Sequence, residues 1–380
     1  MNHKPLKIGF DAKRAFLNKT GLGNYSRAAI CALAEFFPEN QYYLYTPKVR
    51  TDSVPDFLKN FSNTQTKLPA GGAFKSFWRS KGIIRDLKRD QIELYHGLSQ
   101  ELPLGIKNLG IKTVVTIHDL IYLKYPEYFG FINRKIYEWK ARTACENADL
   151  IIAVSEQTKA DLVQAFKLSP QKIKVVYQGC NPLFRQPKNN AVKEALRIKY
   201  QLPKKFILNV GTIETRKNLL LAVKSLKNIP SEVSLVVVGR PTKYAEIVKN
   251  YLVKEALQNR VLFLSDVSFE DLPTIYQLAE VFVYPSRYEG FGIPIVEALC
   301  SGTPVIAATG SCLEEAGGPD SIYVGPDDDA SFAHQINLIL QDDQLKLKMK
   351  TKGLEYARKF EEKNIAQNLM NVYQQALNYA

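Results

Sequence analysis

The sequence lacks the features that mark disulfide-rich or membrane-spanning proteins. Its 380 residues contain five scattered cysteines with no CxxC spacing, a pattern that disfavours a disulfide framework or a zinc site and favours buried thiols in a reducing compartment. No apolar run reaches the roughly 20 residues needed to span a bilayer. The N-terminal residues hold no signal-peptide core. We therefore expect a cytoplasmic protein.

Acidic residues are fewer than basic ones, and the difference is concentrated in the first half of the chain. Lys and Arg number 51 against 38 Asp and Glu, a net charge of +13. Residues 1–184 carry 27 cations and 16 carboxylates, a net +11, whereas residues 185–380 are nearly neutral. The asymmetry predicts an anionic partner for the first half, either a membrane surface or a phosphorylated acceptor. No zinc finger, basic zipper or aromatic RNA-binding signature favours nucleic acid.

One basic segment leaves two interpretations open. Phe74–Asp90 (FKSFWRSKGIIRDLKRD) interleaves apolar side chains with six Lys and Arg. It is either a helix packed on its own domain or an interfacial segment on anionic lipid, which would place the protein peripherally on the inner face of the membrane. Gly82 interrupts the segment and argues against one continuous helix.

Short runs rich in Val, Ile, Leu and Tyr alternate with helical patterns along the chain. Such alternation predicts α/β domains with parallel sheets covered on both faces. The expected strands are Leu6–Phe10, Tyr42–Thr46, Ile92–Tyr95, Thr113–Ile117, Leu150–Val154, Lys174–Tyr177, Phe206–Val210, Ser234–Val238, Val261–Leu264, Val281–Tyr284, Pro304–Ala307 and Ser321–Val324. Twelve strands in two halves fit two doubly wound, Rossmann-like domains better than one barrel.

The domain boundary is expected at Gln178–Pro187 (QGCNPLFRQP), which concentrates Gly, Asn and Pro. We predict one domain over residues 1–180, a second over 181–360, and a helical tail over 361–380. Ligands of doubly wound sheets bind at the carboxyl ends of the strands, so the facing edges of the two domains are the expected site.

The densest motif is YPSRYEGFGIPIVEALCSGTPVI, residues Tyr284–Ile306. A loop with two glycines follows a strand, and Pro294 suits the first position of a helix. The amides of Gly292 and Ile293 would then form an anion site at the start of that helix. Glu289 and Glu297 flank this site. Carboxylates do not bind phosphate, so they suit hydroxyl groups of a sugar and a ribose, although Glu297 alone would also suit the dipole of the first helical turn.

The second motif is NVGTIETRKNLL, residues Asn209–Leu220. Arg216 and Lys217 follow a strand and a glycine, so both cations are expected at the carboxyl edge of the sheet. A guanidinium fork beside an ammonium suits a diphosphate. Taken without its context, such a pair is most often a solvated surface feature.

Three weaker signals accompany these motifs. Gly21 and Gly23 precede a helix, which resembles a dinucleotide fingerprint with Ser26 in place of its third glycine; a flexible loop is the better interpretation. His118 follows a strand and suits either a substrate contact or a structural role. Asp327–Asp329 contains the DxD pattern of some metal–diphosphate sites, but helix capping explains it better.

The order of these motifs resembles a known family. A glycine loop, His-Asp after a strand, VSE at Val154–Glu156, GTxxxRKN and EGFGxPxxEAxxxGTPV are together similar to the retaining, mannosyltransferase-like glycosyltransferases of family four, also called group 1. The resemblance covers nearly the whole chain. It implies the GT-B architecture of two facing Rossmann-like domains, the first on the acceptor side and the second binding the donor, with the tail helix crossing back to the first.

The resemblance also assigns residues. The implied catalytic residues are His118 and Glu289, beside the transferred sugar. The implied donor-binding residues are Gly21, Gly23, Arg216, Lys217, Val267, Gly292, Ile293 and Glu297. Among these, Glu297 would contact the ribose and Val267 the base through its backbone. Thr212 departs from the pattern, because some members carry Arg there, and leaves the phosphates more dependent on Arg216 and Lys217.

The implied reaction moves a hexose, with mannose favoured, from a GDP- or UDP-linked donor to a glycan or lipid-linked saccharide, with retention and without a metal or other cofactor. Two alternatives stay open at this point. One is a non-catalytic protein that binds sugar nucleotides. The other is a glycoside hydrolase with Glu289 and Glu297 as its acid and nucleophile.

Overall fold

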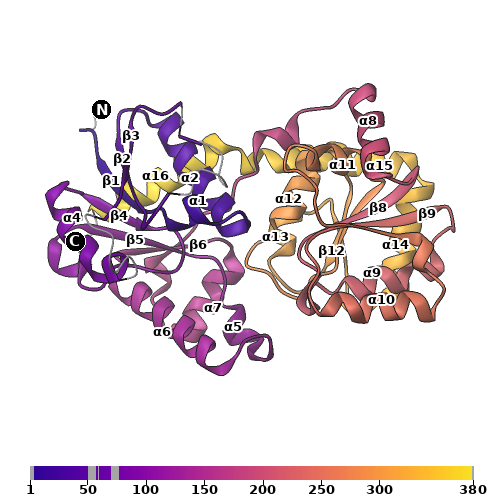
Figure 1. Cartoon of the computed structure of the whole chain (residues 1–380), viewed down its shortest axis with the longest axis horizontal. Coiled ribbons are helices and arrows are strands. Elements are labelled where there is room, and N and C mark those ends of the chain that lie inside the picture. Colours follow the sequence, from indigo (N-terminus) through magenta and orange to yellow (C-terminus); the bar gives the residue numbers. More distant parts are fainter. Residues whose placement is uncertain (1–3, 50–56, 59, 70–76, 379–380) are drawn as a thin grey trace. The chain divides into compact units, whose positions relative to one another are not determined.

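The computed structural model describes residues 4–49, 57–58, 60–69 and 77–378. Two compact units make up the chain: Met1–Gly179 together with Glu362–Ala380, and Cys180–Glu361 (Figure 1). Each unit is a parallel sheet with helices on both faces, so the expected architecture of two Rossmann-like domains is confirmed.

The sheet of the first unit has the strand order β3-β2-β1-β4-β5-β6-β7 among the described residues, with every pair parallel. Its strands are β1 (Lys7–Asp11), β2 (Gln41–Tyr45), β3 (Thr64–Lys67), β4 (Leu94–Gly97), β5 (Lys112–Ile117), β6 (Leu150–Ala153) and β7 (Ile173–Val175). Its longer helices are α1 (Lys13–Leu17), α2 (Gly21–Phe36), α4 (Ile83–Arg89), α5 (Ile121–Lys124), α6 (Phe131–Asn147), α7 (Glu156–Phe166) and α16 (Glu362–Asn378), and a π-helical turn spans Trp78–Gly82. The central strands are buried on both faces, which explains their continuous apolar runs.

The tail helix α16 belongs to the first unit, as the resemblance implies. It lies beside α2 (Figure 1) and buries Ile365, Leu369 and Met370 in the same core as the first strands. The hydroxyl of Tyr373 lies 2.7 Å from Nδ1 of His96, which is buried within β4. A hydrogen bond between residues so far apart in the sequence ties the end of the chain to the centre of this sheet.

The sheet of the second unit has the order β10-β9-β8-β11-β12-β13 among the described residues, again with every pair parallel. Its strands are β8 (Lys205–Val210), β9 (Val233–Val238), β10 (Val261–Leu264), β11 (Val281–Tyr284), β12 (Val305–Ala308) and β13 (Ile322–Val324). Its longer helices are α8 (Asn190–Tyr200), α9 (Leu219–Ser225), α10 (Tyr244–Lys254), α11 (Leu272–Leu278), α12 (Ile293–Cys300), α13 (Leu313–Gly317), α14 (Asp329–Gln341) and α15 (Asp343–Ala357).

Two details of the fold differ from the predictions. Strand β3 was not predicted, because its residues TQTK are polar; the strand lies at the edge of its sheet and is largely exposed. Helix α12 begins at Ile293, so Pro294 is its second residue rather than its first. Among the described helices, none is long and apolar enough to cross a membrane.

Candidate active site

The candidate site of the second unit lies where its strand order reverses. β8 and β11 are neighbours at the centre of the sheet, while the chain leaves them in opposite directions, towards β9 and towards β12. This topological switch point is where open parallel sheets bind ligands, beyond the carboxyl ends of the strands. The two strongest sequence motifs follow β8 and β11, so the fold brings both to one place.

Glu289 is the centre of a dense cluster of hydrogen bonds and ion pairs. One carboxylate oxygen lies 2.7 Å from Nη1 of Arg216, and the other lies 3.1 Å from Nζ of Lys217. The second oxygen also accepts hydrogen bonds from the hydroxyls of Tyr284 and Ser286, both at 2.9 Å. The two predicted cations and the predicted carboxylate therefore form one cluster.

The charge of Glu289 follows from these neighbours. Burial alone would raise its pKa, but Lys217 and Arg216 outweigh burial and lower the pKa to about 2. The carboxylate is thus fully ionised at neutral pH. A group with so low a pKa cannot donate a proton in catalysis, so Glu289 is suited to accepting hydrogen bonds and to fixing the two cations.

Two glycines allow the loop after β8 to take its shape. Gly211 has φ +144°, and a Cβ there would lie 3.1–3.4 Å from the end of the Lys217 side chain. At Gly239, which follows β9, a Cβ would lie 1.9 Å from the carbonyl oxygen of Gly211, a distance that no side chain tolerates. The glycines let Lys217 fold back across the end of β8 towards Glu289.

Arg216 connects the loop after β8 with the loop after β11. Besides Glu289, its guanidinium contacts Glu214 at 2.6 Å and donates to the carbonyl of Tyr288. The backbone of Arg287 in turn donates to the carbonyl of Arg216 at 2.9 Å. The rigid fork of arginine can make several such bonds at once, so this residue fixes the position of the Glu289 loop as well as supplying positive charge.

Glu297 lies in a different environment, although it follows Glu289 by eight residues. Its position on α12 is in the second turn, which corrects the expectation that it stabilises the dipole of the first turn. The Tyr276 hydroxyl donates to it at 3.0 Å. Burial raises the pKa of Glu297 to about 8, against the opposing effect of that hydrogen bond, so the side chain is mostly protonated at neutral pH.

The start of α12 has the geometry of the expected amide site in part. Gly292 is the N-cap residue with φ +125°, and a Cβ there would lie 3.2 Å from side chains of Ala316 and Leu313 on α13. Glycine suits this position, because its backbone conformation is one that other residues rarely adopt and because it leaves room for the close approach of α13. Ile293 is the first helical residue, and first-turn amides have no partner within their own helix.

Val267 is half-buried in the loop after β10, the edge strand of this sheet. Its loop follows the carboxyl end of a strand, as do the two loops around Glu289. Whether its backbone contacts a base stays a prediction.

In the first unit, His118 directly follows β5 and is buried. Its Nε2 donates to the carbonyl of Leu98 at 2.9 Å, its Nδ1 lies 3.4 Å from the side-chain amide of Gln178, and the ring packs edge-on against Tyr25 at 4.6 Å. Burial lowers the pKa of His118 to about 4, so the ring is neutral at physiological pH. Its role beside a sugar stays a prediction, and it would be that of a neutral hydrogen-bonding group.

The prediction of a flexible loop at Gly21 and Gly23 was wrong. Both glycines lie within the first turn of α2. A Cβ at Gly23 would lie 1.8 Å from the carbonyl oxygen of Asn18, whereas nothing lies within 4 Å of one at Gly21. Gly23 therefore allows the tight approach of the preceding turn, which is a structural role, and any donor contact here would come from the exposed Gly21.

The DxD pattern serves the structure of the second unit. Asp328 caps α14 by accepting from the amide of Ser331 at 2.9 Å, and Asp327 pairs with Arg287.

The Phe74–Asp90 segment is described from residue 77 onward; residues 74–76 lie outside the described part. Ile83 and Leu87 of α4 are buried in the first unit, which supports the packed helix rather than the interfacial segment.

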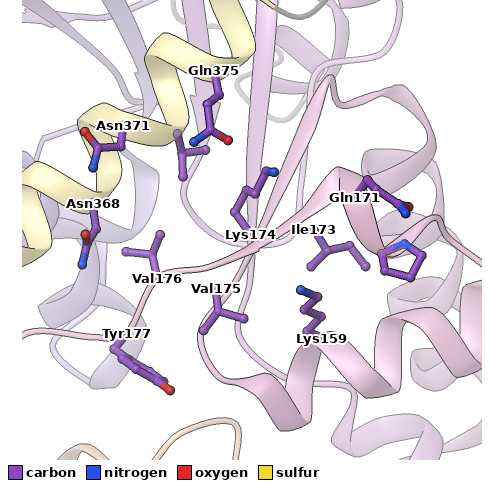
Figure 2. A pocket seen from close by; sticks show the side chains of 12 residues that line it. Lys159, Gln171, Ile173, Lys174, Val175, Val176, Tyr177, Asn368, Asn371 and Gln375 are labelled. Carbon is purple, nitrogen blue, oxygen red and sulfur yellow. The ribbon is translucent and has the colours of Figure 1, made fainter.

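A hollow of about 610 Å³ lies elsewhere in the first unit, along the outer edge of β7 (Figure 2). Asn368, Asn371 and Gln375 of α16 line it from one side, and Lys159 and Lys174 from the other. None of the predicted site residues lines this hollow. The candidate site is thus identified by its side-chain chemistry and its place at the switch point rather than by the shape of a cavity.

Several contacts escaped the sequence analysis. Tyr284 and Ser286 bind Glu289, Tyr276 binds Glu297, and Gln178 contacts His118. The first two lie within the densest motif, so their closeness to Glu289 was a usable signal. The other two meet their partners only through the fold.

Comparisons with known proteins identify the family of the chain. Residues 192–359 match the model of the glycosyl transferases group 1, and residues 33–182 match that of glycosyltransferase family 4. Among curated relatives, the chain is 26% identical to O-antigen chain mannosyltransferase B of Escherichia coli over 97% of this chain and 99% of that one. It is 27% identical to O-antigen chain mannosyltransferase RfbU of Salmonella typhimurium over 85% and 88% of the two chains.

Solved structures show the same fold. HepE of Anabaena in complex with UDP and glucose matches 97% of this chain and 100% of its own, with a TM-score of 0.74 and 18% identity. Sucrose-phosphate synthase of Thermosynechococcus elongatus matches 99% and 100%, with a TM-score of 0.77 and 23% identity. The chain belongs to the group 1 glycosyltransferases of the GT-B fold. It is therefore a hexosyltransferase enzyme, and the non-catalytic and hydrolase alternatives no longer stand.

Proposed function

We propose that this enzyme transfers a hexose, with mannose favoured, from a GDP- or UDP-linked donor to a glycan or lipid-linked saccharide. The observation that carries the proposal is the cluster of Glu289, Arg216 and Lys217 at the switch point of the second unit. The curated relatives named as O-antigen mannosyltransferases support mannose and a saccharide acceptor. The neighbour that binds UDP supports a nucleotide diphosphate at this fold.

The cluster suits departure of a diphosphate. Breaking a glycosyl–phosphate bond leaves negative charge on the diphosphate and positive charge on the sugar, so the enzyme must stabilise the leaving group. Lys217 has three N–H groups; Glu289 and Tyr284 accept from it at 3.1 and 2.7 Å, and a third N–H can serve a phosphate oxygen. Together with Arg216 it supplies the charge that a divalent metal supplies in other sites.

The two carboxylates would then read hydroxyl groups. The ionised Glu289 accepts hydrogen bonds from the hexose, and Glu297 accepts from the ribose after releasing its proton to the solvent. We propose that configuration is retained by attack on the face that the diphosphate leaves, with the leaving phosphate taking the proton of the acceptor hydroxyl. This route needs no protein base, which agrees with the low pKa of Glu289 and the neutral His118.

Thermal-shift binding of GDP, UDP and ADP tests the donor, because a nucleotide that binds the folded state raises Tm. The nucleotide that binds is then supplied as its sugar conjugate, with GDP-mannose first, and transfer to a saccharide acceptor is followed by mass spectrometry. A mass increase of one hexose on the acceptor is the expected result. Binding of none of the three nucleotides to the folded enzyme would overturn the proposal.

A further inference from the structure

The outer face of α6 in the first unit carries large apolar side chains that the core does not use. Phe131 is 66% exposed, Ile132 73% and Trp139 56%, and Ile136 is exposed beside them. Ile132, Ile136 and Trp139 are spaced four and three residues apart, so they form one stripe along a single face of the helix. We call Phe131, Ile132, Ile136 and Trp139 the α6 stripe.

The pattern of α6 is the reverse of an ordinary surface helix. The residues that it buries against its own unit are the small side chains Ala141, Ala144 and Cys145. Its large apolar side chains point outward instead. Exposed Trp, Phe and two Ile at one end of a single helix leave a large apolar area in contact with solvent, and apolar side chains grouped in this way mark an interaction surface.

Cations lie beside the stripe. Lys135 is exposed between Ile132 and Ile136, and Arg134 stacks over the ring of Phe131 at 5.4 Å. Lys140 follows Trp139 and pairs with Glu101 at 3.2 Å. Lys135 and Arg142 share a single carboxylate, Glu138, at 3.4 and 3.5 Å. The helix holds four cations against two carboxylates, within a first half of the chain whose net charge is strongly positive.

We propose that the α6 stripe docks the enzyme on an anionic phospholipid surface. Trp and Phe suit the boundary between head groups and acyl chains, and the flanking cations suit acidic head groups. A second copy of this chain fits less well, because a two-fold contact through the stripe would bring the cations of both copies together. The proposal does not rest on the proposed sugar transfer.

The position of the stripe within the unit suits a lipid-borne acceptor. β5 and β6 are parallel, and α6 lies in the crossover between them, so it runs back from the carboxyl edge of the sheet. The stripe occupies its first nine residues, the end nearer to that edge. His118 follows β5 at the same edge. Lipid bound at the stripe would therefore lie on the side of the unit where acceptor chemistry is expected.

Vesicle flotation of the full chain tests the proposal directly. The probes are vesicles of phosphatidylglycerol with phosphatidylcholine, and vesicles of phosphatidylcholine alone. The wild type is expected to float with the anionic vesicles, less with the neutral ones, and less as salt is added. The double variant Ile132→Glu, Trp139→Glu should lose about tenfold or more in vesicle partitioning.

The second unit offers a matched control. Ile198 on α8 and Val253 on α10 are 79% and 63% exposed, so Ile198→Glu with Val253→Glu makes the same change of charge on another surface. This control should float like the wild type. Undiminished flotation of the α6 double variant, or equal loss in both double variants, would overturn the proposal.

A milder variant keeps the test valid if the charged variant does not fold. On anionic vesicles the emission of the wild type should shift to the blue, and Trp139→Phe should abolish that shift while it still floats. Absence of flotation for the wild type contradicts the proposal. So does a dimer, measured by light scattering without lipid, that the α6 double variant disrupts while lipid binding persists.

Discussion

Glu289 and Glu297 lie eight residues apart in one motif, yet the fold gives them opposite charge states. Both are partly buried, and both side chains are hydrogen-bonded. Around Glu289 the two cations of a second loop lower the pKa to about 2, whereas around Glu297 burial without a cation raises it to about 8. The difference shows that neighbouring charge, rather than burial, decides which carboxylate is ionised.

The comparison also separates their roles. An ionised carboxylate between two cations positions those cations and offers both of its oxygens as acceptors, whereas a neutral carboxyl carries an O–H donor and gains its full accepting capacity only when it loses its proton. This pair differs from the acid and nucleophile of a hydrolase, because neither cation of the Glu289 cluster has a place in that chemistry.

The largest expected effect comes from removing either side of the Glu289 cluster. Glu289→Ala and Lys217→Ala should each lower kcat/KM for hexose transfer about 100-fold or more, because each removes a charged contact from the leaving-group site. Circular dichroism should show that both variants remain folded. Lys199→Ala, which breaks the exposed pair with Asp271, is the control and should leave transfer unchanged. Near-wild-type turnover in either cluster variant would remove the site assignment.

Glu289→Gln sharpens the comparison by keeping the size of the side chain and removing its charge. Transfer should again fall steeply. Binding of the nucleotide diphosphate should not weaken, because Arg216 and Lys217 lose the carboxylate that neutralises them and attract phosphate at least as strongly. Calorimetry gives the Kd of the nucleotide, and an assay with the sugar donor gives the rate of transfer. A large loss of nucleotide affinity would show that Glu289 contacts the nucleotide itself.

Glu297→Gln should have a smaller effect, and it should change the affinity for the nucleotide rather than the rate of transfer. An amide has one accepting oxygen and no charge where a carboxylate has two accepting oxygens, so it accepts hydrogen bonds from the ribose hydroxyls more weakly, and the Kd of the nucleotide should rise about tenfold. Transfer at saturating donor should change much less. A variant that loses turnover but binds nucleotide normally would reverse the assignment of the two glutamates.

The smallest effect is on stability, and its sign differs between the two residues. The folded-state pKa of Glu297 is about 8 and its ordinary value 4.5, so the folded state holds a proton that the unfolded state releases, and stability falls as pH rises between these values. The low pKa of Glu289 gives a contribution that is present above 4.5 and lost as pH falls towards 2.

The pH dependence of stability can be measured as Tm against pH. The Tm of Glu297→Gln should rise by a few degrees relative to that of the wild type between pH 4.5 and 8. The Tm of Glu289→Gln should be lower than that of the wild type at neutral pH, and this difference should disappear as pH falls below 4.5. Parallel Tm curves for the wild type and Glu297→Gln would show that the Glu297 carboxyl is ionised in the fold.

Much of the fold was predictable because buried parallel strands are continuous apolar runs. β3 escaped, since an exposed edge strand needs no apolar side chain. The meeting of Arg216, Lys217 and Glu289 was predictable from their place after two strands of one sheet. The contact of Tyr276 with Glu297 was not, because it joins the separate helices α11 and α12. Gly21 and Gly23 look alike in the sequence, and only packing against Asn18 distinguishes them.

The most direct test of the account is the number of protons released when the nucleotide diphosphate binds near neutral pH. Calorimetry in buffers of different ionisation enthalpy measures it. Since the ribose hydroxyls favour the carboxylate form of Glu297, the wild type should release close to one proton more than Glu297→Gln, and Glu289→Gln should release as many as the wild type. Equal proton release by the wild type and Glu297→Gln would contradict the account.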